Sequence, residues 1–599
     1  MICRPDLALR YILWAGISLA LAACDASPRP EPSIDLARQM LSRGDAVGAE
    51  VTLRQLLDQG TAQEDVAAYL GEAELAQGDL IEARRWLAEG HFSEATAGHG
   101  FQMLGRVFMQ ENNLADAGRA FDEAYRYIPD NPELWVDIGR LRYRGGEQIQ
   151  AVEASRKAVD LGPDNAAALT FRAQLVRDSE GMQAALGWFE RAVERNPDNI
   201  DLLADYAATL GELGRAREML EVIRRISVTD EKNPRAYYLQ AVLAARAGRY
   251  DLAQRLMLLT DQKHRDMPAG RLLSGIVDLQ GGNYESAAQT FDTLFETQPD
   301  NRRIRMLLAR SLALGGNHRE LVHRFGDAAL RPSGSPYLAT LVGRSYEALG
   351  DREQASIYLD HAALPRGSDL IAVQGAVPLE VVERRGVEHG RDALSLVRGL
   401  IVSRKPAAAA RQADAFRRKY PGSADALGLS GDAKLAAGQI GPALADYEQA
   451  SSVRRPWPLT RRMVASYQAA GSSDRAESLL AAQVRGNPAN TEAVTMLARQ
   501  LFDKQDFSRA AMLLDHALVN GADRDPEVLG LRAQTALRLD DPATARETAR
   551  RAYDLQPLGR GVTLTYAQVM EAMQEEGASA EALRRKGESG FSSGFGRVR

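Results

Sequence analysis

The sequence predicts an all-α fold built from repeated pairs of helices, and three observations predict it. Pro129, Pro163 and Pro197 lie 34 residues apart, and other small and apolar positions keep the same step. Aromatic residues make up only 6% of the 599 residues, and this composition favours close-packed helices over sheets. Cys3 and Cys24, both near the start, are the only cysteines, so packing must stabilise the rest of the chain without a disulfide framework.

Each 34-residue unit carries two amphipathic stripes with helical spacing. The first stripe consists of Phe101, Leu104, Gly105 and Phe108, and the second of Ala117, Phe121 and Ala124. Spacings of three, four and seven residues place each set on one face of a helix. Small residues such as Gly105 or Gly275 let the two helices approach closely. Glycine near the fifteenth position of the unit ends the first helix, as at Gly146 and Gly214.

These positions resemble the tetratricopeptide repeat (TPR). Between Pro129 and Pro163 the unit places its landmarks in the order of the TPR pattern. They are Trp135, Ile138, Gly139, Gly146, Ala151 and Ala158. The resemblance implies a right-handed α-solenoid of about 15–16 helix-turn-helix repeats.

Carrying the frame along the chain divides it into segments. Units begin near 30, 64, 98, 132, 166, 200, 234, 268, 302 and 336, then near 391, 424, 457, 491 and 526, with a degenerate unit from about 560. We therefore expect repeat arrays over 34–365 and 391–588, and a flexible tail over 589–599. The 366–390 stretch breaks the frame. It is either a decayed repeat or irregular insertion that continues the stack, or a hinge between two sub-solenoids.

The amino terminus predicts export and lipid anchoring. Residues 1–23 have arginines followed by a short apolar run, as in a secretory signal peptide. The sequence Leu21-Ala22-Ala23-Cys24 resembles the bacterial lipobox, which implies a lipidated Cys24 and a membrane anchor. The alternative is an ordinary cleaved signal with a chance cysteine. Residues 24–33 are rich in proline and predict a semi-rigid tether. The expected location is the periplasmic face of a bacterial membrane, and Asp25 favours the inner one.

The resemblance implies that the first helix of each repeat lines a groove, chiefly through its second, fifth, ninth and twelfth positions. Arginine occupies many of these positions, and Tyr238 begins a more apolar stretch with Leu272, Ile276, Leu279 and Met306 that suits a partner helix. The candidate groove arginines are Arg38, Arg106, Arg140, Arg177, Arg310, Arg344, Arg461 and Arg499. A row of guanidinium groups would suit an anionic peptide or polysaccharide. Alternatively, the arginines pair with neighbouring carboxylates, and the next repeat covers the apolar residues.

The sequence offers no recognisable chemical centre. A net charge of −6 argues against a strongly basic nucleic-acid binder. The eight histidines are scattered, and none forms the His-Glu-x-x-His pair of a zinc site. The Gly590 to Gly594 segment matches G-x-S-x-G without the strand and helix that a nucleophile elbow needs. We expect neither an enzyme nor a bound cofactor or metal.

The sequence thus predicts a non-catalytic scaffold that binds other proteins of the bacterial envelope and is held at the membrane by lipidated Cys24. One alternative follows from the resemblance to large TPR lipoproteins. It is a subunit of an exopolysaccharide or exosortase-linked, or pilus, assembly and export system. A second alternative is a binder of anionic ligands through the arginine positions.

Overall fold

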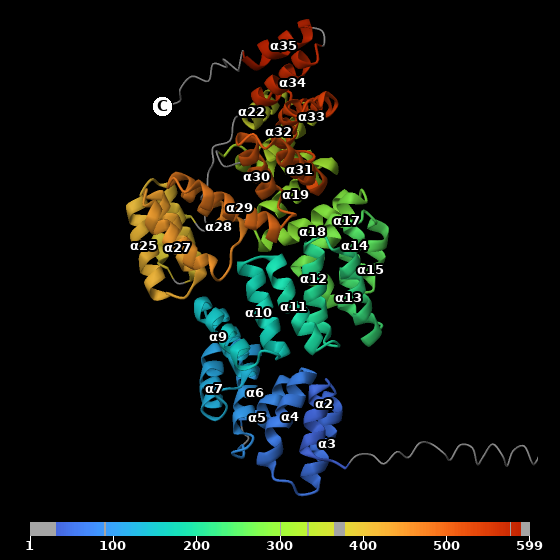
Figure 1. The fold of residues 1–599 in the computed structure, drawn as a ribbon, viewed down its shortest axis with the longest axis vertical. Helices are drawn as coiled ribbons and strands as arrows, with labels where there is room; N and C mark the ends of the chain where they lie inside the picture. The colour runs from blue at the N-terminus through green and yellow to red at the C-terminus, as the bar shows by residue number, and fades with distance from the viewer. Residues whose placement is uncertain are drawn as a thin grey trace, which may run out of the picture. The chain divides into compact units, whose positions relative to one another are not determined.

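The structure is a computed structural model, and it describes residues 31–88, 91–299, 301–331, 335–363, 378–387, 389–574 and 577–588. The predicted signal peptide, Cys24 and the tail from 589 lie outside these residues. Across the described ranges the regular secondary structure is helical, with no strand (Figure 1). This confirms the all-α fold predicted from the repeat. The residues up to Leu141 and those from Arg142 onward form two compact units, here called unit 1 and unit 2.

Unit 1 contains three complete helix pairs and most of a further first helix. Its helices are α2 (Ile34–Ser42), α3 (Ala46–Asp58), α4 (Gln63–Gln77), α5 (Leu80–Ala88), α6 (Ala97–Gln110), α7 (Leu114–Tyr127) and α8 (Pro132–Arg144), the last of which spans the boundary.

Unit 2 continues the alternation of first and second helices. Its helices before the frame break are α9 (Gln148–Leu161), α10 (Ala166–Ser179), α11 (Met182–Arg195), α12 (Ile200–Glu212), α13 (Ala216–Thr229), α14 (Pro234–Arg246), α15 (Tyr250–Leu258), α16 (Gln262–Asp266), α17 (Pro268–Gln280), α18 (Tyr284–Thr297), α19 (Arg302–Leu314), α20 (His318–Ala329), α21 (Pro336–Ala348) and α22 (Arg352–Ala363). Those after it are α23 (Leu379–Arg385), α24 (Gly390–Val402), α25 (Pro406–Lys419), α26 (Ala424–Ala436), α27 (Ile440–Ser451), α28 (Trp457–Ala469), α29 (Ser473–Gly486), α30 (Thr491–Asp503), α31 (Phe507–Ala517), the π-helical turn η1 (Leu518–Ala522), α32 (Pro526–Arg538), α33 (Pro542–Leu555), α34 (Arg560–Ala572) and α35 (Gly577–Glu588).

The first helices begin where the repeat frame places them. From α4 onward, each starts within one residue of its predicted unit start, and only α2 starts four residues later. Asparagine caps several of these starts, because its side-chain oxygen accepts a bond from a backbone amide of the first turn. The capping residues are Asn165, Asn199, Asn233, Asn301 and Asn490.

The predicted close approach is present in several helix pairs, and the partner of the glycine is a large side chain sixteen positions later. A Cβ added at Gly105 would lie 2.3 Å from a ring carbon of Phe121, and one added at Gly275 would lie 2.6 Å from Phe291. A protein interior has no room for such overlaps. Glycine at the eighth position therefore lets a large side chain of the second helix lie against the first.

Most first helices end in the left-handed conformation at the fifteenth position. Gly146 and Gly214 have φ angles of +85° and +76° there, as their predicted role requires. The same position is left-handed in five repeats that lack glycine. The residues concerned are Asn112, Arg404, Gln505, Asp540 and Gln574. The repeat thus imposes this turn even on residues that disfavour it.

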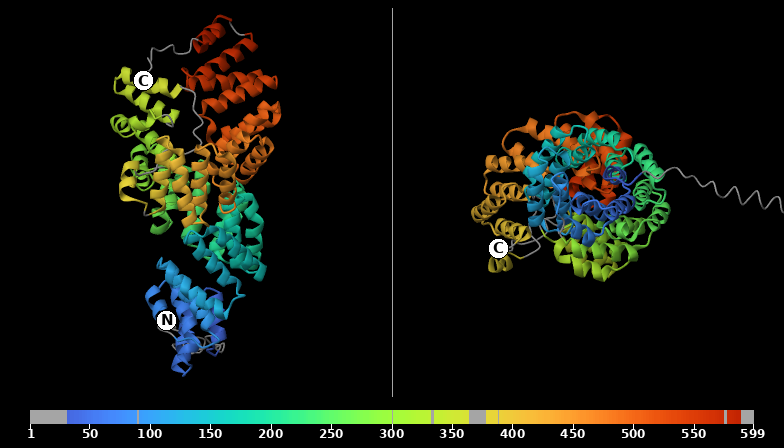
Figure 2. Two further views of the ribbon diagram at one scale, coloured as in Figure 1. Left: turned by 90° about the vertical axis from the view of Figure 1, so that its left-hand side faces the viewer. Right: turned by 90° about the horizontal axis from the view of Figure 1, so that it is seen from below.

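Within unit 2, segments distant in the sequence lie side by side (Figure 2). The Ile149 amide donates to the Gly422 carbonyl at 3.1 Å, and the Arg455 amide donates to the Asp178 carbonyl at 2.8 Å. Helix α11 also contacts α29, where Gly181 and Gly486 meet so closely that a Cβ at Gly181 would lie 2.9 Å from the Gly486 Cα. The α9–α11 section is therefore braced against the α25–α29 section.

The frame break at 366–390 is only partly described, because residues 364–377 lie outside the described ranges. The short helix α23 packs against α24. Both sides of the break belong to unit 2. Whether this stretch is a decayed repeat or a hinge stays a prediction.

Among the helices that the structure describes, none combines the length and the apolarity needed to cross a membrane.

Candidate functional site

The candidate site is an apolar strip on three consecutive first helices of unit 2. It consists of Tyr238 and Val242 on α14, Leu272 and Ile276 on α17, and Met306 on α19. All five side chains are half-buried, and they border the hydrophobic clusters between the helix pairs. Each thus rests on the core and keeps part of its surface exposed. The sequence predicted four of these five residues, and Val242 was missed.

Leu279 differs from the other residues predicted for this stretch. It is only 4% exposed and belongs to the core cluster that includes Phe291 and Leu308. It lies near the end of α17, where the following helix pair covers the helix. The alternative of burial under the next repeat therefore applies to Leu279.

The short helix α16 lies beside one edge of the strip. Its His264 ring lies 6.3 Å from the Tyr238 ring, and the His264 side chain pairs with Asp261, which caps α16. A Cβ at Gly270 would lie 2.0 Å from the His264 carbonyl oxygen, so only glycine lets α16 pack on α17. Burial raises the pKa of Tyr238, so its hydroxyl is neutral at physiological pH.

The charges at the α14 end of the strip compensate one another. Arg235 on α14 reaches Asp201 and Asp205 on α12 at 2.7 Å each, and Arg246 pairs with Glu212. These pairs link α12 to α14 and leave little net charge at that end of the strip. This end of the strip is therefore suited to an apolar partner face rather than to an ion.

In unit 1, the predicted groove arginines have partners within the chain. Arg106 pairs with the buried Asp137 at 2.7 Å. Arg38 lies 3.5 Å from Asp35 and 5.8 Å from the Tyr69 ring centroid. Arg140 also has an interaction partner.

In unit 2, three predicted arginines have carboxylate neighbours and two do not. Arg344 pairs with Glu347 at 2.6 Å, Arg461 with Glu492 at 2.9 Å, and Arg177 lies 3.8 Å from Asp178. Within the described ranges, neither Arg310 nor Arg499 has a carboxylate within ion-pair distance. Internal pairing thus neutralises much of the predicted row, and an anion-binding groove stays a prediction.

The structure adds a buried polar cluster that the sequence analysis did not single out. The Tyr447 hydroxyl donates to Asp432 at 2.9 Å, and the Arg462 guanidinium lies 2.7 Å from the same carboxylate oxygen. Burial raises the pKa of Asp432, while Arg462 and the Tyr447 hydrogen bond act to lower it. The cluster ties α26, α27 and α28 together through one hydrogen bond and one ion pair.

A repeat-based rule would have found this cluster. Asp432 is the ninth residue of its repeat, and Arg462 is the sixth of the next. The same two positions form polar bridges elsewhere in the chain. They join Arg106 to Asp137, Gln174 to Asp205, and Gln534 to Thr565.

The described residues offer no metal-binding group of three or more His, Cys, Asp or Glu side chains. Several histidines make ordinary polar contacts. His99 lies 2.8 Å from Glu72, His318 lies 3.0 Å from Ser345, and His516 lies 2.8 Å from the Pro488 carbonyl. The Gly590 to Gly594 motif lies outside the described residues.

Comparison with known families decides the repeat type. The profile described as Tetratricopeptide repeat matches residues 103–165, 149–200, 272–335 and 495–560. This chain is a TPR protein. The matched segments belong to both units and include α17 and α19 of the apolar strip. TPR arrays are protein-interaction frameworks that expose extended binding surfaces.

Two curated relatives share one description, "Cellulose synthase operon protein C". The TPR chain is 26% identical to the protein from Pseudomonas fluorescens (strain SBW25) over 354 residues, which cover 57% of this chain and 26% of the relative. It is 24% identical to the protein from Xanthomonas axonopodis pv. citri (strain 306) over 278 residues, covering 42% and 18%. The matches thus span about a quarter or less of these relatives.

Solved structures with similar folds include yeast Tom70 and human IFIT1. The Tom70 structure is 14% identical, with a TM-score of 0.28, and the match covers 84% of this chain and 93% of Tom70. The IFIT1 dimer with m7Gppp-AAAA is 17% identical, with a TM-score of 0.33 and coverage of 68% and 94%. At such scores, neither structure indicates a ligand for this chain.

Proposed function

We propose that this chain is a membrane-anchored TPR scaffold that binds a helical segment of another envelope protein through the apolar strip. The observation that carries the proposal is the strip itself. Tyr238, Val242, Leu272, Ile276 and Met306 stay half-exposed on neighbouring first helices. A partner helix with apolar residues on one face would bury them.

The strip suits such a partner because its side chains pack on the buried core and because the charged residues at its α14 end are paired with one another. Its side chains rest on buried core residues, so little conformational freedom is lost when a partner binds. The ion pairs of Arg235 and Arg246 fix neighbouring charges. Removing apolar surface from water then supplies most of the binding energy.

Site-specific cross-linking tests this part of the proposal. A photoreactive amino acid at Ile276, in intact cells of the source bacterium, should capture a defined partner. A matched probe at Val228 on α13, which is 88% exposed, should not capture it. Ile276→Asp should abolish capture from a second probe at Met306. Equal capture from Val228 and Met306, or an unaffected variant, would refute the strip as the binding surface.

The anchor part of the proposal rests on the lipobox-like Leu21-Ala22-Ala23-Cys24. Radioactive palmitate should label the wild-type protein and not Cys24→Ser, and the variant should lose its membrane association. Three acyl chains would anchor firmly, since each buried methylene contributes about 0.8 kcal/mol. Secretion of unlabelled wild-type protein would contradict the anchor.

A more specific function is supported by the two relatives named as cellulose synthase operon proteins. We propose that the scaffold serves an exopolysaccharide assembly and export system at the periplasmic side of the membrane. Deletion of the gene should reduce the extracellular polysaccharide, and the wild-type gene should restore it. The Ile276→Asp variant should restore less. A pilus defect with normal polysaccharide would favour the pilus alternative, and a normal envelope would refute both.

A further inference from the structure

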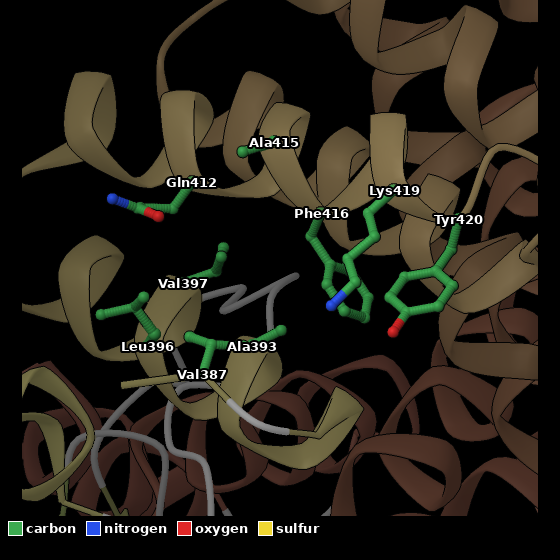
Figure 3. Close-up of a pocket in the computed structure, with 9 residues that line it drawn as sticks. All are labelled: Val387, Ala393, Leu396, Val397, Gln412, Ala415, Phe416, Lys419 and Tyr420. Atoms are coloured by element: carbon green, nitrogen blue, oxygen red, sulfur yellow. The ribbon is translucent and has the colours of Figure 1, made fainter. Parts of the chain in front are cut away.

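A second surface of unit 2 is an apolar pocket between α24 and α25, far along the sequence from the apolar strip. Figure 3 shows Phe416 and Lys419 of α25, and Tyr420 directly after it, facing Leu396 and Val397 of α24 across an opening. The volume is about 180 Å³. A cavity of roughly 150 Å³ holds one benzene molecule, and drug-sized ligands need about 300 Å³ or more. The pocket therefore fits one large apolar side chain.

In the described part of the chain, the helix before α24 is short. The helix α23 has only seven residues (Leu379–Arg385) and packs against α24. The α25 stripe of Gln412, Phe416 and Lys419 has the spacing of one helix face.

The rim of the pocket is basic. Arg411 and Arg418 lie four residues before and three residues after Ala415, so helical spacing places all three on a stripe beside Phe416. Arg411, Arg418 and Lys419 are exposed, and within the described ranges none has a carboxylate at ion-pair distance. The Lys419 ammonium lies 5.4 Å from the Tyr420 ring centroid. The single carboxylate of α25, Asp414, points to Lys434 on α26, 3.4 Å away.

The described neighbouring elements do not reverse this charge. The carboxylates of α23 and α24 are Glu380, Glu383 and Asp392, and their arginines are Arg384, Arg385, Arg391 and Arg398. Of these, Arg385 pairs with the buried Asp392. The pocket has room for one large apolar side chain, and three exposed cations lie along its edge. It is therefore complementary to a peptide segment that has one large apolar residue with carboxylates around it.

We propose that this pocket, defined by Leu396, Val397, Ala415, Phe416, Lys419 and Tyr420, docks an acidic amphipathic helix of a protein partner. One apolar side chain enters the pocket, and the flanking carboxylates pair with Arg411, Arg418 and Lys419. This site is independent of the apolar strip and of the polysaccharide-related function. It would let one scaffold hold two different partners.

Selection from a random library of 18-residue peptides displayed on phage tests the proposal, with full-length mature protein as the target. Two variants at exposed positions should leave the fold intact. Ala415→Glu places a negative charge at the pocket, and Lys419→Glu reverses a rim charge. Lys157→Glu on α9 makes the same charge change at an exposed lysine elsewhere and serves as the control.

Peptides selected on the wild type should be acidic, carry one large apolar residue, and bind more weakly at high salt. Their affinity should fall roughly fivefold or more with either pocket variant and stay unchanged with Lys157→Glu. Selected peptides that are neutral or basic, or that ignore both variants, would overturn the proposal. So would sedimentation showing that the wild type self-associates through this surface and that Ala415→Glu makes it monomeric, because a second copy would then be the occupant.

Discussion

The α17–α18 and α26–α27 helix pairs have the same frame but different chemistry at three equivalent positions. Both place a glycine at the eighth position against a fully buried aromatic ring, Gly275 against Phe291 and Gly431 against Tyr447. In the first pair the next residue is Ile276. In the second it is Asp432, which accepts the Tyr447 hydroxyl bond.

The third position changes together with the other two. The sixth residue of the following repeat is Leu307 after the first pair and Arg462 after the second. Leu307 packs against the apolar core cluster, whereas Arg462 pairs with Asp432 at 2.7 Å. The comparison shows that the repeat determines which positions of neighbouring helices contact each other. The residue types at these positions then decide whether the first-helix face is apolar and free to bind a partner, or polar and paired with the next helix.

The largest expected effect comes from breaking the polar cluster. Arg462→Ala leaves Asp432, whose side chain is 3% exposed, as a buried carboxylate without its ion-pair partner. Such a change costs about 3–5 kcal/mol. Because repeat arrays do not unfold as a single unit, the loss should appear as faster hydrogen exchange in α26–α28.

Arg461→Ala is the matched control, since its partner Glu492 is 52% exposed and the pair contributes about 1 kcal/mol or less. Replacing Asp432 with Leu and Arg462 with Met together should restore most of the protection. If Arg462→Ala exchanged like Arg461→Ala, the cluster would not hold these helices together.

The next effect tests the contact that both pairs share. A Cβ at Gly431 would lie 2.4 Å from the Tyr447 ring, so Gly431→Ala should destabilise the pair by about 1–3 kcal/mol. Gly428 lies on the same helix with nothing within 4 Å of its added Cβ. Gly428→Ala should therefore stabilise by about 0.5–1 kcal/mol. Chemical denaturation measures the free energy of unfolding of both variants. Changes of the same sign would contradict the close contact between Gly431 and Tyr447.

Exchanging the aromatic residues sharpens the comparison further. By analogy with Tyr447, the hydroxyl of Phe291→Tyr would enter the apolar cluster against which Ile276 and Leu307 pack, at a cost of about 1–2 kcal/mol. Tyr447→Phe removes one bond to Asp432 and should cost a similar amount. If Phe291→Tyr left the free energy of unfolding unchanged, the new hydroxyl would have to reach water, and the cluster would not be closed at this point.

The smallest effect is a pH dependence. Burial raises the pKa of Asp432 above 3.8, so the folded state binds its proton more tightly than the unfolded chain does. The stability that this residue contributes is thus greatest at low pH and falls as the pH rises from 3.8 through the folded pKa. Urea denaturation of wild type and Asp432→Asn should show this loss only in the wild type. A wild-type gain in stability over that range, relative to the variant, would contradict it.

Much of the fold followed from local patterns. The period of Pro129, Pro163 and Pro197 predicted the helix boundaries, because caps, turns and amphipathic stripes act within a few residues. Gly146 and Gly214 were read correctly as helix ends. The left-handed Arg404 and Gln505 were not, because only the repeated geometry makes such residues adopt that conformation.

The candidate sites were less predictable. The residues of the apolar strip were found by position, but the exposure of Ile276 and the burial of Leu279 depend on how the next pair packs. The partner of Arg106, Asp137 on α8, was likewise unknown until neighbouring helices were placed, whereas Arg344 pairs with Glu347 of its own helix. The pocket at Phe416 gave no sequence signal, since it depends on how α24 and α25 pack together.

By itself, the sequence determined that this protein is a chain of helix pairs, because a period of 34 residues with two apolar stripes has no other low-energy arrangement. Only the tertiary structure decided which first-helix side chains pair with or pack against neighbouring residues and which remain exposed. It also decided where α9–α11 meets α25–α29. Those outcomes depend on contacts between residues up to about 300 positions apart, such as Ile149 with Gly422 and Gly181 with Gly486, and no local pattern encodes such distances.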